Sequence, residues 1–114
     1  MTRSATVVLN GDTRKFAISD EIKRYAMIDV GFVQTKNGNF VYDHPLYLDS
    51  PYNANLKIKI TINEAMDKLS MVITDKNGLK KVNIFQKEEL QPVRELLDFV
   101  LKDMFEKQIL EEVY

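Results

Sequence analysis

The chain contains no cysteine and a single histidine among its 114 residues. Without cysteine there can be no disulfide bond, no thiol nucleophile and no thiolate metal ligand, as is common for proteins of a reducing cytoplasm. One histidine leaves mainly carboxylates as metal ligands, and the sequence has no EF-hand loop. We therefore predict no metal site, no cofactor and no catalytic residue carried by a recognisable motif.

Glycine is scarce as well, and the four glycines are widely separated. This spacing excludes a Walker loop and a glycine-rich dinucleotide-binding turn. Long apolar runs are also absent, because no segment approaches the roughly 18 apolar residues that cross a bilayer. The first apolar run is too short for the core of a secretory signal. We therefore predict a cytoplasmic protein with no membrane contact.

Neither sign of charge is in large excess. Sixteen basic residues face seventeen acidic ones, for a formal net charge of −1. This balance gives no general attraction to nucleic acid or to anionic lipid. With 45% apolar and 29% charged residues, the composition is that of an ordinary globular protein. We predict one domain over residues 1–114, long enough to fold without disulfides or metals.

Three of the four glycines directly follow asparagine, at Asn10-Gly11, Asn37-Gly38 and Asn77-Gly78. Asn-Gly between β-prone runs is typical of a tight hairpin turn. Two-residue loops would fix the register of each hairpin. The predicted opposite pairs are Ala5 with Phe16 and Val7 with Arg14, Val33 with Tyr42 and Thr35 with Phe40, and Met71 with Ile84 and Ile73 with Val82.

The stretch NLKIKITIN over residues 55–63 alternates strictly between apolar and polar side chains. Such alternation predicts a strand with one buried and one solvated face. A second strand should follow over residues 69–74. The buried set is expected to be Leu56, Ile58, Ile60 and Ile62, and the solvated set Lys57, Lys59 and Thr61.

A short helix is predicted after Ile18. Ser19 resembles an N-cap, and acidic residues follow it in the first turn, where the helix dipole favours them. Gly31 should mark the return to strand, while residues 26–30 fit either helix or strand. The core-facing residues are expected to be Ile22, Tyr25 and Ala26.

A longer helix should begin between Lys87 and Pro92 and run nearly to the C-terminus. Its apolar stripe comprises Leu90, Val93, Leu97, Val100, Leu101 and Met104. Phe99 instead projects among charged residues, and Leu110 and Val113 fall on roughly the same outer side. Clustered exposed apolar residues often mark an interface, so Phe99, Leu110 and Val113 are candidates for a homodimer contact. A lone exposed Phe also occurs in monomers.

The most irregular stretch, DHPLYLDSPYN over residues 43–53, is predicted to be an ordered loop. It is rich in titratable and hydrogen-bonding groups, which suggests the rim of a small-ligand pocket with His44 as a proton carrier. The structural alternative is that His-Pro and Ser-Pro form turns and the tyrosines pack at their edges. The candidate ligand-binding residues are Tyr42, Asp43, His44, Tyr47, Tyr52 and Asn53.

A basic face is predicted where Lys57, Lys59 and Lys81 share the solvated side of the sheet, with Phe85 as a possible neighbour. Basic and aromatic side chains on an open sheet are one way to hold nucleic acid. Lysines on a solvated face also serve solubility and edge protection. The acidic balance of the chain argues against a strong phosphate binder.

Over its whole length the chain resembles a small uncharacterised family from lactic acid bacteria. The likeness is carried by GFVQTKNGNFVYDHPLYLDSPYNANLKIKI, by FQKEELQPVRELLDFVL and by a nearly equal chain length. The resemblance implies a fold remotely like the TATA-binding-protein type and a role in amino-acid metabolism. It carries over no catalytic or ligand residue, and a shared fold does not imply DNA binding.

Together these patterns predict an α+β fold. An antiparallel sheet of six to seven strands should carry a short helix from the N-terminal half and a long C-terminal helix on one face. The leading functional hypothesis is a non-enzymatic accessory or small-ligand-binding protein of amino-acid metabolism. The alternatives are a nucleic-acid-binding module and an enzyme that uses His44 as acid or base.

Overall fold

The protein has an α+β fold with two antiparallel sheets. The computed structural model describes residues 6–9, 11–46, 56–75, 77–86 and 88–113. A 3-10 turn over Glu88–Leu90 precedes the second helix. The elements are β1 (Lys15–Ile18), α1 (Arg24–Val30), β2 (Val33–Gln34), β3 (Phe40–Leu46), β4 (Leu56–Ile62), β5 (Leu69–Asp75), α2 (Gln91–Glu106) and β6 (Leu110–Val113).

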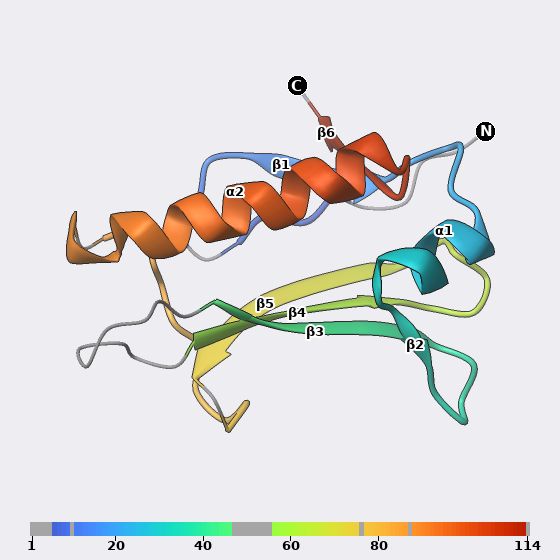
Figure 1. Ribbon diagram of the computed structural model, residues 1–114, viewed down its shortest axis with the longest axis horizontal. Helices are drawn as coiled ribbons and strands as arrows, with labels where there is room; N and C mark the ends of the chain where they lie inside the picture. The colour runs from blue at the N-terminus through green and yellow to red at the C-terminus, as the bar shows by residue number, and fades with distance from the viewer. Residues whose placement is uncertain (1–5, 10, 47–55, 76, 87, 114) are drawn as a thin grey trace.

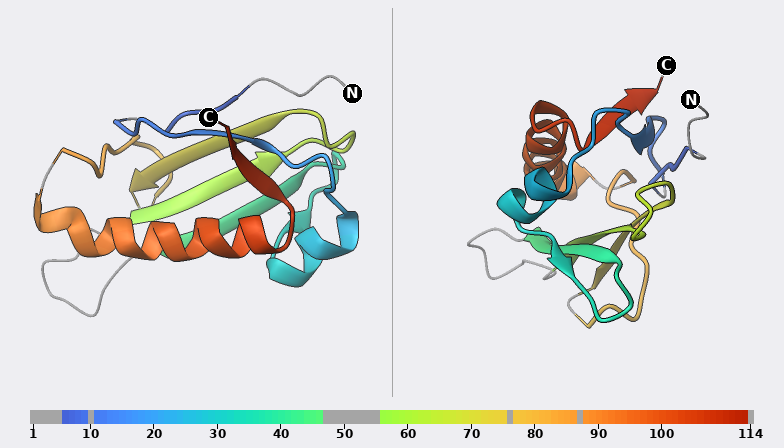
Figure 2. Two further views of the ribbon diagram at one scale, coloured as in Figure 1. Left: turned by 90° about the horizontal axis from the view of Figure 1, so that it is seen from above. Right: turned by 90° about the vertical axis from the view of Figure 1, so that its right-hand side faces the viewer.

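Four strands of the described chain form the main sheet, in the order β2-β3-β4-β5, and β1 pairs with β6 in a second, smaller sheet. Figure 1 shows α2 and the small sheet over one face of the main sheet, with α1 at one end. The end-on view of Figure 2 shows the same two layers. The predicted α+β class is confirmed, and of the two helices α2 lies over one face of the main sheet. The prediction of a single sheet is wrong, because β1 and β6 pair in a separate sheet that lies beside α2.

Strand β4 is the centre of the main sheet and has the predicted alternation. Leu56, Ile58, Ile60 and Ile62 are at most 4% exposed and point into the core. Lys59 is exposed on the other face. Strands of this kind are stabilised because one face buries apolar surface while the other stays hydrated. The face that carries Lys59 is the outer face, which lies opposite α2.

The first Asn-Gly corner has a different register from the predicted one. Val7 lies opposite Phe16 rather than Arg14. The Asp12 carboxylate accepts hydrogen bonds from the N–H groups of Thr13 and Arg14, at 2.7 and 3.2 Å. This turn takes up residues 12–14, so the pairing with Val7 is made by Phe16 instead of Arg14. Ala5 and Asn10, which belonged to that prediction, lie outside the described residues.

The second corner is also longer than predicted. Val33 lies opposite Val41 instead of Tyr42. The Thr35 N–H donates to the Asn39 carbonyl, which makes a three-residue loop, and Gly38 in that loop has a φ of 90°. A one-residue change of register moves every side chain to the opposite face. The predicted partnerships of Tyr42 and Phe40 are therefore wrong.

The third corner has the predicted register. The Val82 N–H donates to the Ile73 carbonyl at 2.8 Å, and Thr74 lies opposite Lys81. Met71 and Ile84 are both buried, as expected for residues of one face. The side chains of β5 and of the segment after the turn agree with the turn itself, which is why this register was readable from sequence. The returning segment makes an isolated bridge with β5 rather than a further strand.

Helix α1 begins later than predicted and buries another face. The Ser19 Oγ accepts a hydrogen bond from the Glu21 N–H at 3.1 Å, so Ser19 begins a turn that precedes the helix. Tyr25 is 70% exposed, which corrects its predicted core position, while Ala26 and Met27 are buried. The predicted buried face was counted from a helix start at Ser19. The helix starts at Arg24 instead, and the residues that pack against the core are Ala26 and Met27. Gly31 ends the helix with a φ of 118°, as its predicted role requires.

Helix α2 has its predicted apolar stripe but not its predicted length. Val93, Leu97, Val100, Leu101 and Met104 are buried. The helix ends at Glu106, and Gln108 has a φ of 58°, which turns the chain back into β6. The Ile109 N–H then donates to the Met104 carbonyl at 2.9 Å.

The end of α2 changes the status of the predicted dimer residues. Leu110 is 1% exposed, so the prediction that it faces outward is wrong. Val113 lies opposite Lys15 in the small sheet and is half-buried. Only Phe99, at 72% exposed, is on the surface as predicted. Leu110 and Val113 were misplaced because the helical period was extended beyond the residue where the helix stops.

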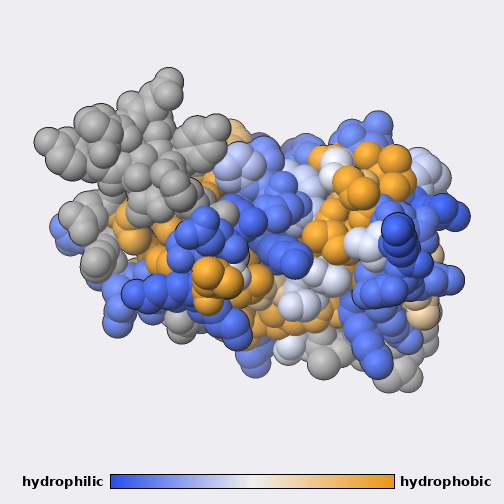
Figure 3. All heavy atoms as spheres, turned by 90° about the horizontal axis from the view of Figure 1, so that it is seen from below, coloured by the Kyte–Doolittle hydropathy of each residue, from blue (hydrophilic) through white to orange (hydrophobic). Residues whose placement is uncertain are grey.

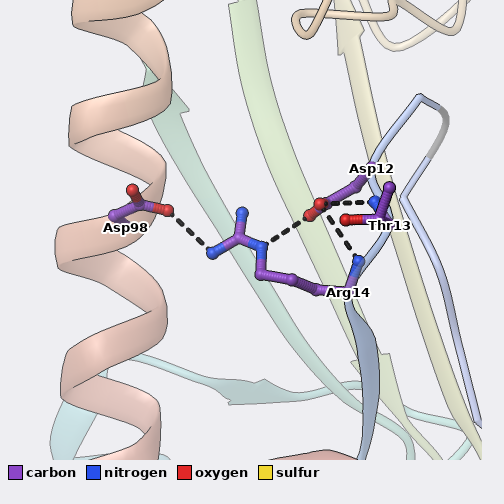
Figure 4. A network of polar contacts seen from close by, with 4 residues as sticks. All are labelled: Asp12, Thr13, Arg14 and Asp98. Atoms are coloured by element: carbon purple, nitrogen blue, oxygen red, sulfur yellow. Dashed lines mark hydrogen bonds and ion pairs between the residues drawn. The ribbon is translucent and has the colours of Figure 1, made fainter. Parts of the chain in front are cut away.

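A polar network attaches the N-terminal hairpin to α2 (Figure 4). Arg14 Nε lies 2.9 Å from Asp12 Oδ2, and Arg14 Nη1 lies 2.9 Å from Asp98 Oδ1. The guanidinium also lies 5.5 Å from the centre of the Phe16 ring. Burial lowers the pKa of Arg14, but the two carboxylates outweigh it, and the net pKa is raised. Arg14 therefore keeps its charge and bridges two elements far apart in sequence.

Candidate ligand-binding site

The residues of the predicted 43–53 loop divide into a strand and an undescribed part. Asp43, His44 and Pro45 belong to β3, which pairs with β4 as far as Leu46 opposite Leu56. Pro45 is tolerated there because β2 pairs only with the start of β3, so among the described strands this part of β3 is a sheet edge. The loop prediction is wrong for residues 43–46. Tyr47, Tyr52 and Asn53 lie outside the described residues.

The strand geometry also separates the candidate ligand residues between two faces. Tyr42 is 9% exposed, and its ring centre lies 5.3 Å from that of Phe32 and 5.5 Å from that of His44. His44 itself is exposed. Burial, and secondarily the charge of Asp103, raises the pKa of Tyr42. Asp43 points to the outer face, because neighbouring residues of a strand alternate.

On the outer face, a hollow of about 370 Å³ contains all three predicted basic-face lysines. Figure 3 views this face and shows hydrophilic residues over much of it. The volume is within the usual range of small-ligand sites, roughly 300–1,000 Å³. The lining residues are Asp43, Lys57, Lys59, Val72, Thr74, Asn77, Gly78, Leu79 and Lys81.

Strand register places these side chains together. Asp43 lies directly opposite Lys59, and Lys57 lies opposite Thr74. Thr74 in turn lies opposite Lys81. Directly opposite residues of an antiparallel pair share a face, so the charged groups of β3, β4 and the segment after β5 meet on one surface, with Thr74 of β5 among them.

The hollow has an ion pair at its side and an ordered threonine beneath. Lys57 Nζ lies 3.2 Å from Asp43 Oδ2. Thr74 is 6% exposed, and its hydroxyl donates to the Asp75 carbonyl at 2.9 Å. Thr74 lies on the outer face of β5 but is buried there. Because the Thr74 hydroxyl already donates to a backbone carbonyl, Thr74 lines the bottom of the hollow without offering that proton to a ligand.

The Asn77-Gly78 turn forms the rim. A methyl group on Gly78 would lie 3.8 Å from Lys57 Nζ, so this turn is adjacent to the lysine head group. Gly78 has a φ of 75°, which favours glycine. The next residue, Leu79, is 87% exposed and adds an apolar edge to a charged site.

The chemistry of the hollow is that of an anion site with one acidic group. Three ammonium groups can hold carboxylate or phosphate oxygens, and the Asp43 carboxylate can hold a cationic group. Phe85, predicted as a possible aromatic neighbour, instead packs against the core. Among the described residues that line the hollow, none is aromatic. Base stacking, the usual complement to lysine in single-strand binding, has no platform in this lining.

Sequence reasoning identified the three lysines and missed their neighbours. Asp43 was assigned to a loop, so its alternation with Tyr42 and His44 was not used. The register of the Asn77-Gly78 hairpin was correct and already placed Lys81 opposite Thr74. Extending the strand pattern from Phe40 through Leu46 would have added Asp43 to the lysine face.

Other classes of site have no support in the described ranges. No group of three or more His, Cys, Asp or Glu side chains there could hold a metal ion. None of the helices in those ranges is long and apolar enough to cross a membrane.

The comparison with known proteins agrees with the likeness expected from sequence. Residues 1–111 match the family model DUF1831, whose description reads "Putative amino acid metabolism". The chain belongs to the DUF1831 family. A crystal structure of a DUF1831 family protein from Lactobacillus plantarum is 33% identical, covers 99% of both chains and has a TM-score of 0.87. No curated protein matches this DUF1831 chain.

Proposed function

We propose that this DUF1831 protein is a non-enzymatic accessory protein of amino-acid metabolism that binds a small carboxylate-bearing metabolite in the outer-face hollow. The observation that carries the proposal is the convergence of Lys57, Lys59, Lys81 and Asp43 on one cavity. The family description supplies the metabolic context. The remote TATA-binding-protein-like fold and the cytoplasmic location belong to this proposal, and the absence of cysteine supports the second.

The charges of the hollow are matched to an amino acid or a related acid. Lys57 is paired with Asp43, whereas Lys59 and Lys81 form no ion pair with another described residue. A ligand carboxylate placed between Lys59 and Lys81 would relieve the repulsion between them. A ligand ammonium group would lie toward Asp43, which already accepts one cation. Leu79 and Val72 would contact the apolar part of such a ligand.

The proposal is tested by thermal shift with a panel of amino acids, 2-oxo acids and dicarboxylic acids. A bound ligand at a hundred times its Kd should stabilise the fold by about 2.7 kcal/mol, with a rise in Tm. Lys59→Gln and Lys81→Gln should each reduce that shift. Lys102→Gln, an exposed lysine on α2, is the matched control and should keep it.

Two results would overturn the assignment. One is that no acid in the panel raises the Tm of the wild-type protein. The other is a shift that is equal in Lys59→Gln, Lys81→Gln and wild type but is lost in His44→Ala. The second result would favour the hypothesis that Tyr42 and His44 form the ligand site, since His44 lies on the face opposite the hollow. Turnover of a hit that His44→Ala abolishes would favour an enzyme.

Nucleic-acid binding is the second candidate, because the lysines predicted for it do lie together. The net charge of −1 and the non-aromatic lining favour a small anion instead. Phosphate contacts strengthen as salt is lowered, so a single-stranded oligonucleotide should be tried at low ionic strength. Binding there that Lys59→Gln and Lys81→Gln weaken, without any response to small acids, would replace the proposed function.

A further inference from the structure

The outer-face hollow contains more positive charge than one carboxylate group neutralises. Three of its four charged side chains are lysines and the fourth is Asp43, whereas the whole chain has a formal net charge of −1. Lys57 Nζ lies 3.2 Å from Asp43 Oδ2, and the Lys57 side chain is 26% exposed. No described residue forms an ion pair with Lys59 or Lys81. Within the described structure, two lysines of the hollow therefore keep their full charge for a ligand.

These two lysines start from diagonal corners of the hollow. Lys59 of β4 lies opposite Val72 of β5. Thr74 follows two residues later on the same face of β5, and Lys81 lies opposite Thr74. With roughly 4.8 Å between neighbouring strands and 3.4 Å per residue along a strand, the backbones of Lys59 and Lys81 are about 12 Å apart.

This separation favours two anionic groups over one. Bringing both ammonium groups onto a single carboxylate would fix two long side chains and hold like charges close together. Two carboxylates, one beside each lysine, avoid both costs. A phosphate group also carries a charge close to −2, but it concentrates that charge at one point. The spacing of Lys59 and Lys81 is therefore better matched to a ligand with a carboxylate at each end.

The surface between the two lysines suits an apolar linker. Val72 lies beside Lys59 and lines the hollow. The Thr74 hydroxyl is already used, because it donates to the Asp75 carbonyl at 2.9 Å. Leu79 adds exposed apolar surface at the rim, and Figure 3 shows hydrophobic residues among the hydrophilic ones of this face. A short methylene chain would contact these apolar groups while its two ends meet the lysines.

We propose that the ligand of the hollow is a dicarboxylic acid, with one carboxylate held by Lys59 and the other by Lys81. The inference rests on the proposed function, because it requires a carboxylate-bearing ligand in this hollow. It narrows the ligand to molecules with two carboxylates joined by a short chain, acidic amino acids included. A monocarboxylic acid would leave one lysine without a partner and should bind more weakly.

Isothermal titration calorimetry with matched acids tests the assignment. The probes are succinate, glutarate and adipate, each compared with its own monoamide in a buffer free of phosphate and carboxylate. A monoamide keeps the length and one carboxylate of its parent, so the comparison isolates the second charge. Wild-type protein should bind the dicarboxylate that fits best about tenfold more tightly than its monoamide, the ratio expected for one charged hydrogen bond.

Lys59→Gln and Lys81→Gln should each weaken binding of that dicarboxylate about tenfold, to the affinity of the wild type for the monoamide. The monoamide should lose much less affinity in either variant, because it can bind at the lysine that remains. Lys102→Gln, at an exposed position of α2, is the control and should bind like the wild type. Circular dichroism should show all three variants folded, since the replaced lysines are exposed.

The inference fails if each dicarboxylate binds no more tightly than its monoamide, and the proposed carboxylate site would then still stand. It also fails if inorganic phosphate binds more tightly than every dicarboxylate, or if the monoamide loses as much affinity as its parent in both variants. Absence of binding by all six acids would overturn it as well. The proposed function falls with it only if the wider panel of amino acids and 2-oxo acids also gives no rise in Tm.

Discussion

Tyr42 illustrates how one residue connects the core with the surface. Its ring is buried between Phe32 and the exposed His44. Burial disfavours the phenolate, and the nearby Asp103 charge adds to that effect, so the pKa of Tyr42 is raised above its ordinary value. The folded protein therefore holds the phenol proton to higher pH than the unfolded chain.

This raised pKa predicts a loss of stability at alkaline pH. The contribution of Tyr42 is fully present below the ordinary tyrosine pKa of about 10 and is lost as the pH rises through the raised value. Tyr42→Phe removes the titrating group, so its free energy of unfolding should fall less steeply between about pH 9 and 11. Urea unfolding at several pH values measures both slopes. Equal slopes in Tyr42→Phe and in the wild type would show that burial does not hold the phenol proton of Tyr42.

At the same scale, local sequence predicted the glycines better than the helix starts. Gly31 was expected to end a helix, and its positive φ gives the physical reason. Ser19 looked like an N-cap, but its hydroxyl is used in the turn that precedes α1. A serine hydroxyl accepts a nearby backbone N–H both at a helix N-cap and in a turn, so the residues around Ser19 do not show which of the two structures forms.

Among the elements, α2 makes the simplest stability prediction. Leu97 is fully buried in the stripe that faces the sheet, and Phe99 is 72% exposed two residues later. Leu97→Ala should lower the free energy of unfolding by about 2–5 kcal/mol, through lost burial and a cavity. Phe99→Ser should change it by less than about 0.5 kcal/mol. Urea denaturation of the two variants gives both values, and similar costs at the two positions would show that the helix face is assigned incorrectly.

The hairpins show where element-level prediction succeeds and fails. At Asn77-Gly78 the turn and the apolar pairing indicate the same register, and the structure has it. At Asn37-Gly38 one extra loop residue changes the partner of Val33. An Asn-Gly dipeptide locates a turn, whereas loop length depends on hydrogen bonds that strand neighbours decide.

For the whole molecule, the two sheets share one core. Phe16 of β1, Ile60 of β4 and Leu97 of α2 belong to the same buried cluster. The Arg14 bridge to Asp98 and the contact of the Phe16 and Phe105 rings, 6.1 Å between centres, join the small sheet to α2. Neither sheet has a separate core in the described structure, so they should unfold together.

This predicts a single cooperative transition. Urea curves from far-ultraviolet circular dichroism and from tyrosine fluorescence should coincide, as in two-state unfolding. Leu97→Ala should move both curves to lower urea by the same amount, because Leu97 lies in the shared cluster. Two separated transitions, or a fluorescence change that precedes the loss of secondary structure, would show that the small sheet unfolds independently.

The sequence by itself determined the features that depend on period and local turn chemistry. Alternation over residues 55–63 identified β4 and both of its faces, and the helical spacing after Pro92 identified the buried side of α2. These patterns are readable because burial repeats every second residue in a strand and about every 3.6 residues in a helix.

Only the tertiary structure decided which distant residues meet. Asp43, predicted in a loop, lies in β3 and lines the lysine hollow. Leu110, predicted in a helix, lies in β6. The tertiary structure also left Tyr25 and Ile28 uncovered on α1. Register, the end of α2 and the packing face of a seven-residue helix depend on contacts between segments far apart in the chain. Such contacts leave no periodic signal in one sequence, so the lysine hollow could be recognised as one site only in the folded structure.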